Sequence, residues 1–229
     1  MITKVTWLGH SSFSIQTAGF HLLVDPFFKY NPKSLFSAED IKADFILVTH
    51  GHGDHFGDTV SIAQRTGATV ICNAEIGDWL KKKDVKVHSQ HLGGGFHHPF
   101  GYVKLTLALH GSALPDGSCG GNPAGFLITL KDSGKKVYLA GDTGLFGDMR
   151  LIGEEGVELA ALPIGDNFTM GPADALRAVK LIQPKVVIPI HYNTFPLIQQ
   201  DASAWAAEVE TQTSSKVKVL APGESIELA

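Results

Sequence analysis

Short apolar runs dominate the first part of the chain and predict β-strands. Residues 2–8 and 12–17 alternate loosely between apolar and polar positions, and residues 20–24 form a third short run. Residues 45–48 are apolar without interruption, which is typical of a strand buried on both faces. We therefore predict an antiparallel β start that is followed by a core strand.

Helical and β-like segments alternate in the next part of the chain. Residues 58–65 and 74–83 have helical character, whereas residues 68–72 and 85–88 favour short strands. In residues 103–109 the larger apolar side chains occupy every second position, which predicts a half-buried strand. This order of segments indicates the α/β class.

A loop rich in glycine and proline separates these segments from a second set. Residues 111–123 contain four glycines and two prolines, and we place the boundary between two halves there. Each half supplies β-rich and then α-rich segments, so we expect residues 1–229 to form one domain, with two sheets face to face and helices outside. Beyond the loop we predict strands at 124–130, 136–140, 159–164, 186–190, 216–220 and 225–228, and helices at 172–182 and 202–211.

Composition and charge exclude several classes of function. The 229 residues are 44% hydrophobic, which is ample for a sizeable core. The net charge is -4 and the longest basic run is Lys81-Lys82-Lys83, so no nucleic-acid partner is expected. The first residues lack the apolar core of a signal peptide, and no run approaches the ~18 apolar residues of a membrane span. Cys72 and Cys119 are isolated, which favours free thiols in a cytoplasmic protein.

Four candidate metal ligands follow directly after the core strand at residues 45–48. Residues 49–55 read Thr-His-Gly-His-Gly-Asp-His, and the two glycines allow the backbone to turn tightly. Imidazoles and a carboxylate suit ions such as zinc, manganese, nickel or iron. The alternative is a polar surface loop that is rich in histidine by chance. Four ligands within seven residues make metal binding the better interpretation.

Three further candidate ligands each follow a predicted strand. They are His110, Asp142 and His191. Taken singly, each is explained as well by a turn residue or by a core histidine with satisfied hydrogen bonds. Together with the cluster in residues 49–55, they supply the seven ligands that a dinuclear site would use.

The order of these residues resembles the metal-ligand pattern of the metallo-β-lactamase superfamily. The pattern consists of His50-x-His52-x-Asp54-His55, His110, Gly141-Asp142-Thr143 and Pro189-Ile190-His191, and it covers nearly the whole chain. The resemblance implies a four-layer αββα sandwich. It also implies that one ion is held by His50, His52 and His110, that the other is held by Asp54, His55 and His191, and that Asp142 bridges them.

Three other stretches resemble a group of small metal-dependent hydrolases within that superfamily. They are residues 7–13, 23–26 and 165–172. These hydrolases are relatives of the ascorbate-6-phosphate lactonases and of the phospholipase D that acts on N-acyl phosphatidylethanolamines. This chain is shorter than either relative, so the resemblance does not transfer their substrates to it.

The expected chemistry is hydrolysis by a hydroxide that bridges two divalent ions. Two ions ~3.5 to 4 Å apart can share a water molecule, lower its pKa and polarise the bond under attack. Zinc is the first expectation from the order of affinities, and manganese, nickel or iron remain open. We expect Asp54 to steer the hydroxide proton, Asp142 to bridge the ions, and a small-molecule phosphodiester or lactone to be the substrate. The alternatives are a nuclease acting on RNA or DNA and a metal-binding protein without catalysis, and a homo-oligomer is also left open.

Four residues outside the ligand pattern are candidates for supporting roles. His10 lies in a tight loop between two predicted strands, where it would be a substrate contact or general acid, or would bond to the loop backbone. Asp25 is expected either to accept a hydrogen bond from a ligand imidazole or to form an Asp-Pro turn. Asn193 and Thr194, just beyond His191, are candidate pocket residues.

Four more histidines surround a run of three glycines and are not expected to bind metal. They do not follow a predicted strand directly, so we interpret them as solvated side chains of a flexible loop or of a lid. These residues are His88, His91, His97 and His98.

Overall fold

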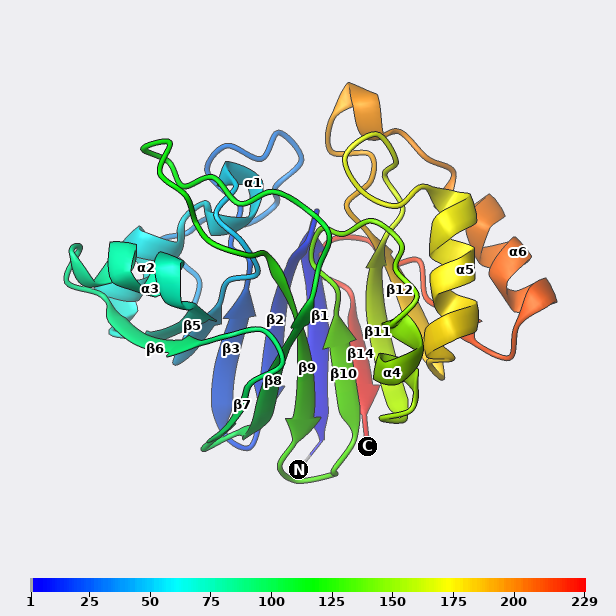
Figure 1. Cartoon of the computed structure of the whole chain (residues 1–229), viewed down its shortest axis with the longest axis horizontal. Helices are drawn as coiled ribbons and strands as arrows, with labels where there is room; N and C mark the ends of the chain where they lie inside the picture. Colours follow the sequence, from blue (N-terminus) through cyan, green and yellow to red (C-terminus); the bar gives the residue numbers. More distant parts are fainter. Residues whose placement is uncertain (1) are drawn as a thin grey trace.

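The apolar runs form two seven-stranded β-sheets that pack face to face in the computed structural model, which describes residues 2–229 (Figure 1). The strand order is β14-β1-β2-β3-β4-β5-β6 in the first sheet and β13-β12-β11-β10-β9-β8-β7 in the second. In each sheet, four antiparallel strands continue into three parallel ones. Helices cover the two outer faces, so the expected αββα sandwich is confirmed.

The first sheet takes six strands from the beginning of the chain and one from its end. The first strand, β1, pairs antiparallel with the last strand, β14, so that Val5 lies opposite Ile226. The strands are β1 (Thr3–Gly9), β2 (Ser12–Thr17), β3 (Phe20–Val24), β4 (Phe45–Leu47), β5 (Thr69–Asn73), β6 (Lys86–Gln90) and β14 (Ser225–Leu228).

The second sheet is formed by seven strands that follow one another along the chain. The predicted strands at 124–130 and 136–140 form a hairpin around Asp132-Ser133-Gly134, because β9 and β10 pair antiparallel with Leu127 opposite Tyr138. The strands are β7 (Gly95–His98), β8 (Gly101–Leu107), β9 (Ala124–Leu130), β10 (Lys136–Leu139), β11 (Val157–Pro163), β12 (Val186–Ile190) and β13 (Lys216–Val217).

The helices begin with the residue types that favour helix starts. Asn73 accepts a hydrogen bond from Ile76 N, Asp201 accepts two from the first turn of its helix, and Pro172 occupies the first turn of another. Within residues 2–229, no helix has both the length and the apolar composition that crossing a bilayer requires. The helices are α1 (Gly53–Phe56), α2 (Thr59–Thr66), α3 (Ala74–Lys81), α4 (Met149–Gly153), α5 (Pro172–Ile182) and α6 (Ala202–Gln212), with a 3-10 turn η1 (Pro196–Ile198).

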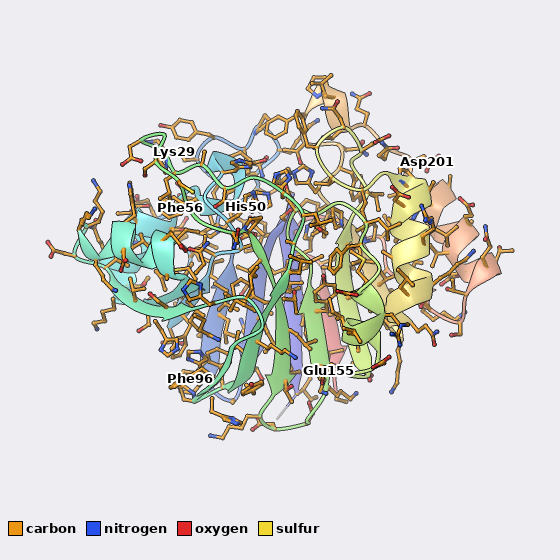
Figure 2. All side chains as sticks on the ribbon, in the orientation of Figure 1. Lys29, His50, Phe56, Phe96, Glu155 and Asp201 are labelled. Carbon is orange, nitrogen blue, oxygen red and sulfur yellow. The ribbon has the colours of Figure 1, made fainter. Side chains whose placement is uncertain are left out.

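Figure 2 shows that side chains fill the space between the secondary-structure elements, and the buried apolar ones form three clusters. Phe126 belongs to the layer between the sheets, Ile76 to the layer under α2 and α3, and Trp205 to the layer under α5 and α6. Each of the three is almost completely buried. Truncating a core side chain of this size to alanine typically costs about 2 to 5 kcal/mol, so the sandwich holds its loops on a rigid support.

The boundary between the two halves lies earlier than the sequence predicted. The chain passes from the first sheet to the second through residues 91–94, because β7 pairs with β8 rather than with β6. The loop of residues 111–123 instead packs beside α3, where Asn73 Nδ2 donates to the carbonyls of Gly120 and Asn122 at 2.6 and 2.9 Å. Its glycines signal irregular backbone, which does not by itself mark a change of sheet.

The interpretation of the four histidines around the three glycines as residues of a flexible loop was wrong for His97 and His98, which lie in β7. His88 lies in β6, within the segment 85–88 for which a strand was predicted. The ring of His98 stacks on Phe100, with centroids 5.3 Å apart, and its Nε2 lies 3.3 Å from Gln90 Oε1. A short hairpin with little apolar alternation gives too weak a pattern for a strand to be predicted.

Candidate metal centre

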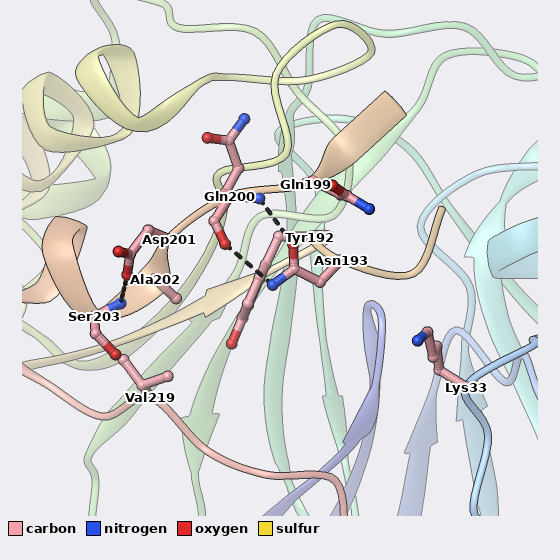
Figure 3. Close-up of a pocket in the computed structure, with 9 residues that line it drawn as sticks. All are labelled: Lys33, Tyr192, Asn193, Gln199, Gln200, Asp201, Ala202, Ser203 and Val219. Atoms are coloured by element: carbon pink, nitrogen blue, oxygen red, sulfur yellow. Dashed lines mark hydrogen bonds between the residues drawn. The ribbon is translucent and has the colours of Figure 1, made fainter. Parts of the chain in front are cut away.

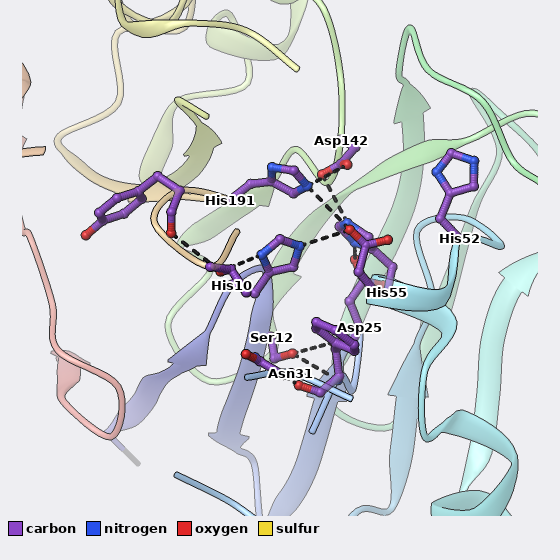
Figure 4. Close-up of polar contacts among 12 residues, drawn as sticks. His10, Ser12, Asp25, Asn31, His52, His55, Asp142 and His191 are labelled. Atoms are coloured by element: carbon purple, nitrogen blue, oxygen red, sulfur yellow. Dashed lines mark hydrogen bonds and ion pairs between the residues drawn. The ribbon is translucent and has the colours of Figure 1, made fainter. Parts of the chain in front are cut away.

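The candidate ligands meet at one edge of the sandwich because the strands that precede them run in the same direction. The carboxyl ends of β1, β3 and β4 in the first sheet lie at this edge, as do those of β8, β10 and β12 in the second. A backbone hydrogen bond from His191 N to His10 O, 3.1 Å long, joins the two sheets there. Figure 4 shows that the side chains from both sheets converge.

Three imidazoles form the first group. His52 Nδ1 lies 3.2 Å from both His50 Nε2 and His110 Nε2. Each ring offers one nitrogen within 4.8 Å of the others, so the group has the donors to hold an ion. His50 is fully buried, and its pKa is held well below the usual value by burial and by the nearby His55. A neutral ring is the form that binds a metal.

The second group contains Asp54, His55 and His191, and the structure adds His10 to them. One donor atom from each of these four residues lies within 4.8 Å of the others. Asp54 and His55 belong to the short helix α1, whereas His191 follows β12 directly. His191 has a φ of 53°, a left-handed conformation that is uncommon for histidine and is typical of functional sites.

Asp142 lies between the two groups. Its Oδ2 is 3.0 Å from His191 Nε2 and 3.5 Å from His110 Nε2, and its Oδ1 is 3.1 Å from His55 Nε2. The preceding Gly141 has a φ of 61°, and a Cβ there would lie 2.9 Å from the Thr49 side chain. Glycine therefore allows the Asp142 loop to approach the other sheet.

Several buried polar atoms of the cluster lack hydrogen bonds, and this fits a metal ion. His55 Nε2, His191 Nε2 and Asp142 Oδ1 make none with the residues that the structure describes, although they lie close together. A buried polar atom without a partner is costly, and coordination to a divalent ion would satisfy it. The donor set of imidazoles and carboxylates suits zinc, manganese, iron or nickel.

Asp25 lies behind His55. Its Oδ2 is 2.8 Å from His55 Nδ1 and accepts a hydrogen bond from Thr49 Oγ1 at 2.6 Å, while Oδ1 accepts from Thr49 N at 2.8 Å. A carboxylate with these donors fixes the proton of His55 on Nδ1 and leaves Nε2 free for an ion. Asp25 has a φ of 44°, so this contact is held at the expense of backbone strain.

His10 contacts Asp54 and Thr194 rather than the loop backbone through its ring. Its Nε2 lies 3.2 Å from Asp54 Oδ2 and its Nδ1 lies 2.9 Å from Thr194 Oγ1. Burial lowers the pKa of His10 to about 4, which outweighs the opposing effect of Asp54, so the ring is neutral at pH 7. Because the Asp54 carboxylate can only accept, Nε2 donates to it and Nδ1 accepts from Thr194.

The charges of the cluster depend on one another. Burial opposes ionisation of Asp54 and Asp142, but contacts with the histidines outweigh it and hold the pKa of both carboxyls well below the usual range. Burial likewise opposes protonation of His191, but Asp142 outweighs it and raises its pKa to about 9. An ion that binds to His191 must therefore displace the proton from its ring, whereas His50 is already neutral.

The cluster opens into a hollow of about 530 Å³, which we call the site hollow. Its aromatic and aliphatic residues were not predicted from the sequence, because apolar residues in loops carry no ligand pattern. The residues that line it are His52, Asp54, His110, Asp142, Phe168, His191, Phe195, Pro196 and Leu197.

Neither Asn193 nor Thr194 lines the site hollow. Thr194 is buried beneath His10, which it contacts. Asn193 lines a separate, more polar hollow with Lys33 and Tyr192 (Figure 3), and its side chain pairs with the backbone of Gln200. The structure thus brings together the seven candidate ligands, His10, Asp25 and Thr194, but places Asn193 outside this arrangement.

Comparison with known proteins agrees with this arrangement. A family model described as the beta-lactamase superfamily domain matches residues 21–192. The chain belongs to this superfamily. A UPF0173 metal-dependent hydrolase of Pelotomaculum thermopropionicum is 50% identical over 230 residues, covering 98% of this chain and 100% of the relative. One from Symbiobacterium thermophilum is 49% identical over 229 residues, with 98% and 100% covered.

A solved structure of a metallo hydrolase matches this chain over the whole length of the chain. Igni18, a metallo hydrolase from the hyperthermophilic archaeon Ignicoccus hospitalis, matches with a TM-score of 0.91 and 38% identity. The match covers 100% of this chain and 99% of Igni18. The resemblance stated from the sequence is therefore confirmed, and the protein is a metal-dependent hydrolase.

Proposed function

We propose that the protein uses two divalent metal ions to hydrolyse an ester-like bond in a small molecule. The position of Asp142 is the observation that best supports two ions, because its carboxylate lies within 3.5 Å of His110 in the first group and within 3.1 Å of His55 in the second. A single carboxylate that reaches both groups suits a bridging ligand. One ion would be held by His50, His52 and His110, the other by Asp54, His55 and His191, and both by Asp142.

The residues around the ions would position the ligands and the reacting water. When bound, two divalent ions lower the pKa of a water molecule towards neutrality and polarise the bond under attack. Asp25 would orient His55, and the pair of His10 and Thr194 would hold Asp54. Asp54 is partly exposed and lines the site hollow, where its ionised carboxylate would accept a hydrogen bond from the attacking water. We therefore assign His10 a positioning role through Asp54.

Zinc is the first candidate for both positions, because it binds such nitrogen and oxygen donors more tightly than manganese or iron does. The bond would be a phosphodiester or a lactone, since both undergo attack by a metal-activated water. We also propose that the protein works in the cytoplasm. The free thiols of Cys72 and Cys119 suit a reducing compartment.

The proposal is tested by metal analysis combined with substrate profiling. The protein as purified should contain about two ions per chain, and chelation followed by reloading with zinc or manganese should remove and restore hydrolysis. Asp142→Ala should lose most of the activity and at least one ion, whereas the exposed Asp148→Ala should keep both. A protein that binds two ions but hydrolyses no ester, lactone or phosphodiester would instead be a metal-binding protein without catalysis.

A further inference from the structure

The outer wall of the site hollow is apolar. Phe168, Phe195, Pro196 and Leu197 line it together with several of the candidate ligands. Two of these side chains are unusually exposed for large apolar groups, with 52% of Phe168 and 69% of Leu197 accessible to solvent. Exposed apolar side chains gathered at the mouth of a cavity typically mark a ligand-binding surface.

Hydrogen bonds fix the loop that carries Phe168. Asp166 N donates to Met170 O at 3.1 Å, and Met170 N donates to Thr143 O at 3.0 Å, which ties this loop to the Asp142 loop. Asp166 and Asn167 have φ values of 63° and 52°, conformations that persist only where the surroundings enforce them. The Phe168 ring is therefore presented by a fixed turn.

The segment that carries Leu197 is fixed independently. Asn193 N donates to Ile198 O at 2.7 Å, and the Asn193 side chain makes two further bonds with the backbone of Gln200, of 2.8 and 3.1 Å. Ile198 anchors the turn because it is completely buried. The two loops thus form a wall that exists before a ligand arrives, which lowers the entropy cost of binding.

The site hollow offers little to a charged substrate. The described residues that line it include no lysine or arginine. Asp25, Asp54 and Asp142 would offset three of the four positive charges of two divalent ions, and a hydroxide nucleophile would offset the last. A phosphate group is normally held by arginine or lysine side chains or by helix N-termini, and the wall consists of aromatic and aliphatic side chains instead.

We propose that the substrate is an uncharged carboxylic ester, open-chain or cyclic, that places an apolar group against Phe168 and Leu197. This inference rests on the proposed hydrolase function and selects the lactone over the phosphodiester. Water adds to the carbonyl carbon, the acyl carbon–oxygen bond breaks, and the leaving oxygen takes a proton. The products are an alcohol and a carboxylic acid, which releases one proton at neutral pH, and a lactone gives both groups on one molecule.

A series of γ-lactones with alkyl tails of increasing length tests the inference on the metal-loaded enzyme. Burying a methylene contributes ~0.8 kcal/mol, so kcat/KM should rise about fourfold for each methylene until the wall is covered. Bis(4-nitrophenyl) phosphate should be hydrolysed more slowly than the long lactones despite its good leaving group. Binding of n-alkyl carboxylates, the product class, should strengthen by a similar factor for each methylene in calorimetric titrations.

Variants of the wall assign the effect to its residues. Phe168→Ala and Leu197→Ala should each reduce the ratio of kcat/KM between γ-decalactone and γ-butyrolactone by about tenfold, because a large apolar contact is lost. Phe96→Ala and Leu151→Ala are matched controls, since 48% and 51% of these side chains are exposed outside the site hollow. Figure 2 shows Phe96 near the opposite edge of the sheets from His50. Both controls should leave the ratio unchanged.

The outcomes separate this inference from the proposed function. A phosphodiester hydrolysed faster than every lactone, or a kcat/KM and carboxylate affinity independent of chain length, would overturn the inference while leaving a two-ion hydrolase. Absence of hydrolysis of both classes by protein that holds two ions would overturn both. A chain-length dependence that Phe168→Ala and Leu197→Ala weaken, and that Phe96→Ala and Leu151→Ala leave unchanged, would support both.

Discussion

Asp25 Oδ2 lies 2.8 Å from His55 Nδ1, so a residue at the end of β3 orients a candidate ligand in α1. Asp25→Asn would replace the oxygen that accepts from both Thr49 and His55 by an amide group that donates. We expect the affinity for the ion beside His55 to fall by about 10- to 100-fold. Competition with a chelator of known affinity measures this change.

Asp58→Asn provides the control for this variant. Asp58 is also a buried carboxylate, but its Oδ2 accepts from the backbone of Phe28 and Lys29 and contacts no candidate ligand. The Asp58→Asn variant should have a lower free energy of unfolding but an unchanged metal affinity. Equal metal affinities in the wild type and Asp25→Asn would show that Asp25 does not orient His55.

His52→Ala and His55→Ala should deplete different ions. His52 contacts His50 and His110, whereas His55 contacts Asp142 and lies in the group with Asp54 and His191. Each variant should retain about one ion per chain. Cobalt substitution with absorption spectroscopy distinguishes a site of three imidazoles from one that includes carboxylates, and circular dichroism checks that the buried His55 variant folds. Loss of the same ion from both variants would show that our division of the ligands is incorrect.

Thr194→Val should lower kcat with little effect on KM. The substitution keeps the shape of the side chain but removes the hydroxyl that donates to His10 Nδ1, 2.9 Å away. Loss of one hydrogen bond of this kind costs about 1 kcal/mol, so kcat should fall roughly 5- to 10-fold as Asp54 becomes less well oriented. Thr194→Ser restores the hydroxyl and should restore kcat. If the serine and valine variants behave alike, Thr194 does not act through His10.

Acid should destabilise the protein partly through His98. Burial, and then the nearby His88, lower the pKa of His98 from 6.5 to about 4, so the unfolded state binds a proton more readily than the folded state does. The contribution of neutral His98 to the free energy of unfolding is fully present above pH 6.5 and is lost as the pH falls towards 4. At pH 4.5 the loss is on the order of 2 kcal/mol.

The variant His98→Phe isolates this effect. It keeps the ring that stacks on Phe100 but cannot be protonated. Urea unfolding of chelator-treated protein at pH 7 and 4.5 should therefore show a smaller loss of stability in His98→Phe than in the wild type. Equal losses in the two proteins would assign the acid sensitivity to other groups.

Hydrophobic periodicity predicted most of the fold because most elements bury one or both faces. The helix predicted at residues 172–182 has the bounds of α5, since a proline begins it and another follows it. The helices α1 and α4 have only four and five residues, which is too short for a period to be recognised. The first strand of the β7–β8 hairpin has no clear alternation of apolar and polar residues. We therefore predicted the boundary between the sheets at residues 111–123, later in the chain than residues 91–94, where it lies.

The candidate ligands could be recognised because residues 49–55 concentrate four of them and the others follow strands. Their partners were harder to assign. Thr194 was expected to line a pocket, but it lies beneath His10, and only three-dimensional packing brings these residues together. Phe168 and Leu197 could not be predicted, since an exposed apolar residue in a loop looks the same whether or not it faces a cavity.

The candidate ligands come from both sheets, so metal binding and folding are coupled. Ions held between residues 50–55, which follow a strand of the first sheet, and His110, Asp142 and His191, which follow strands of the second, would cross-link segments distant in the chain. Such cross-links reduce the entropy of the unfolded state and stabilise the protein in proportion to the logarithm of free metal. Chelation should therefore lower Tm. Hydrogen exchange should increase first at the ligand edge of the sandwich, while the opposite edge stays protected.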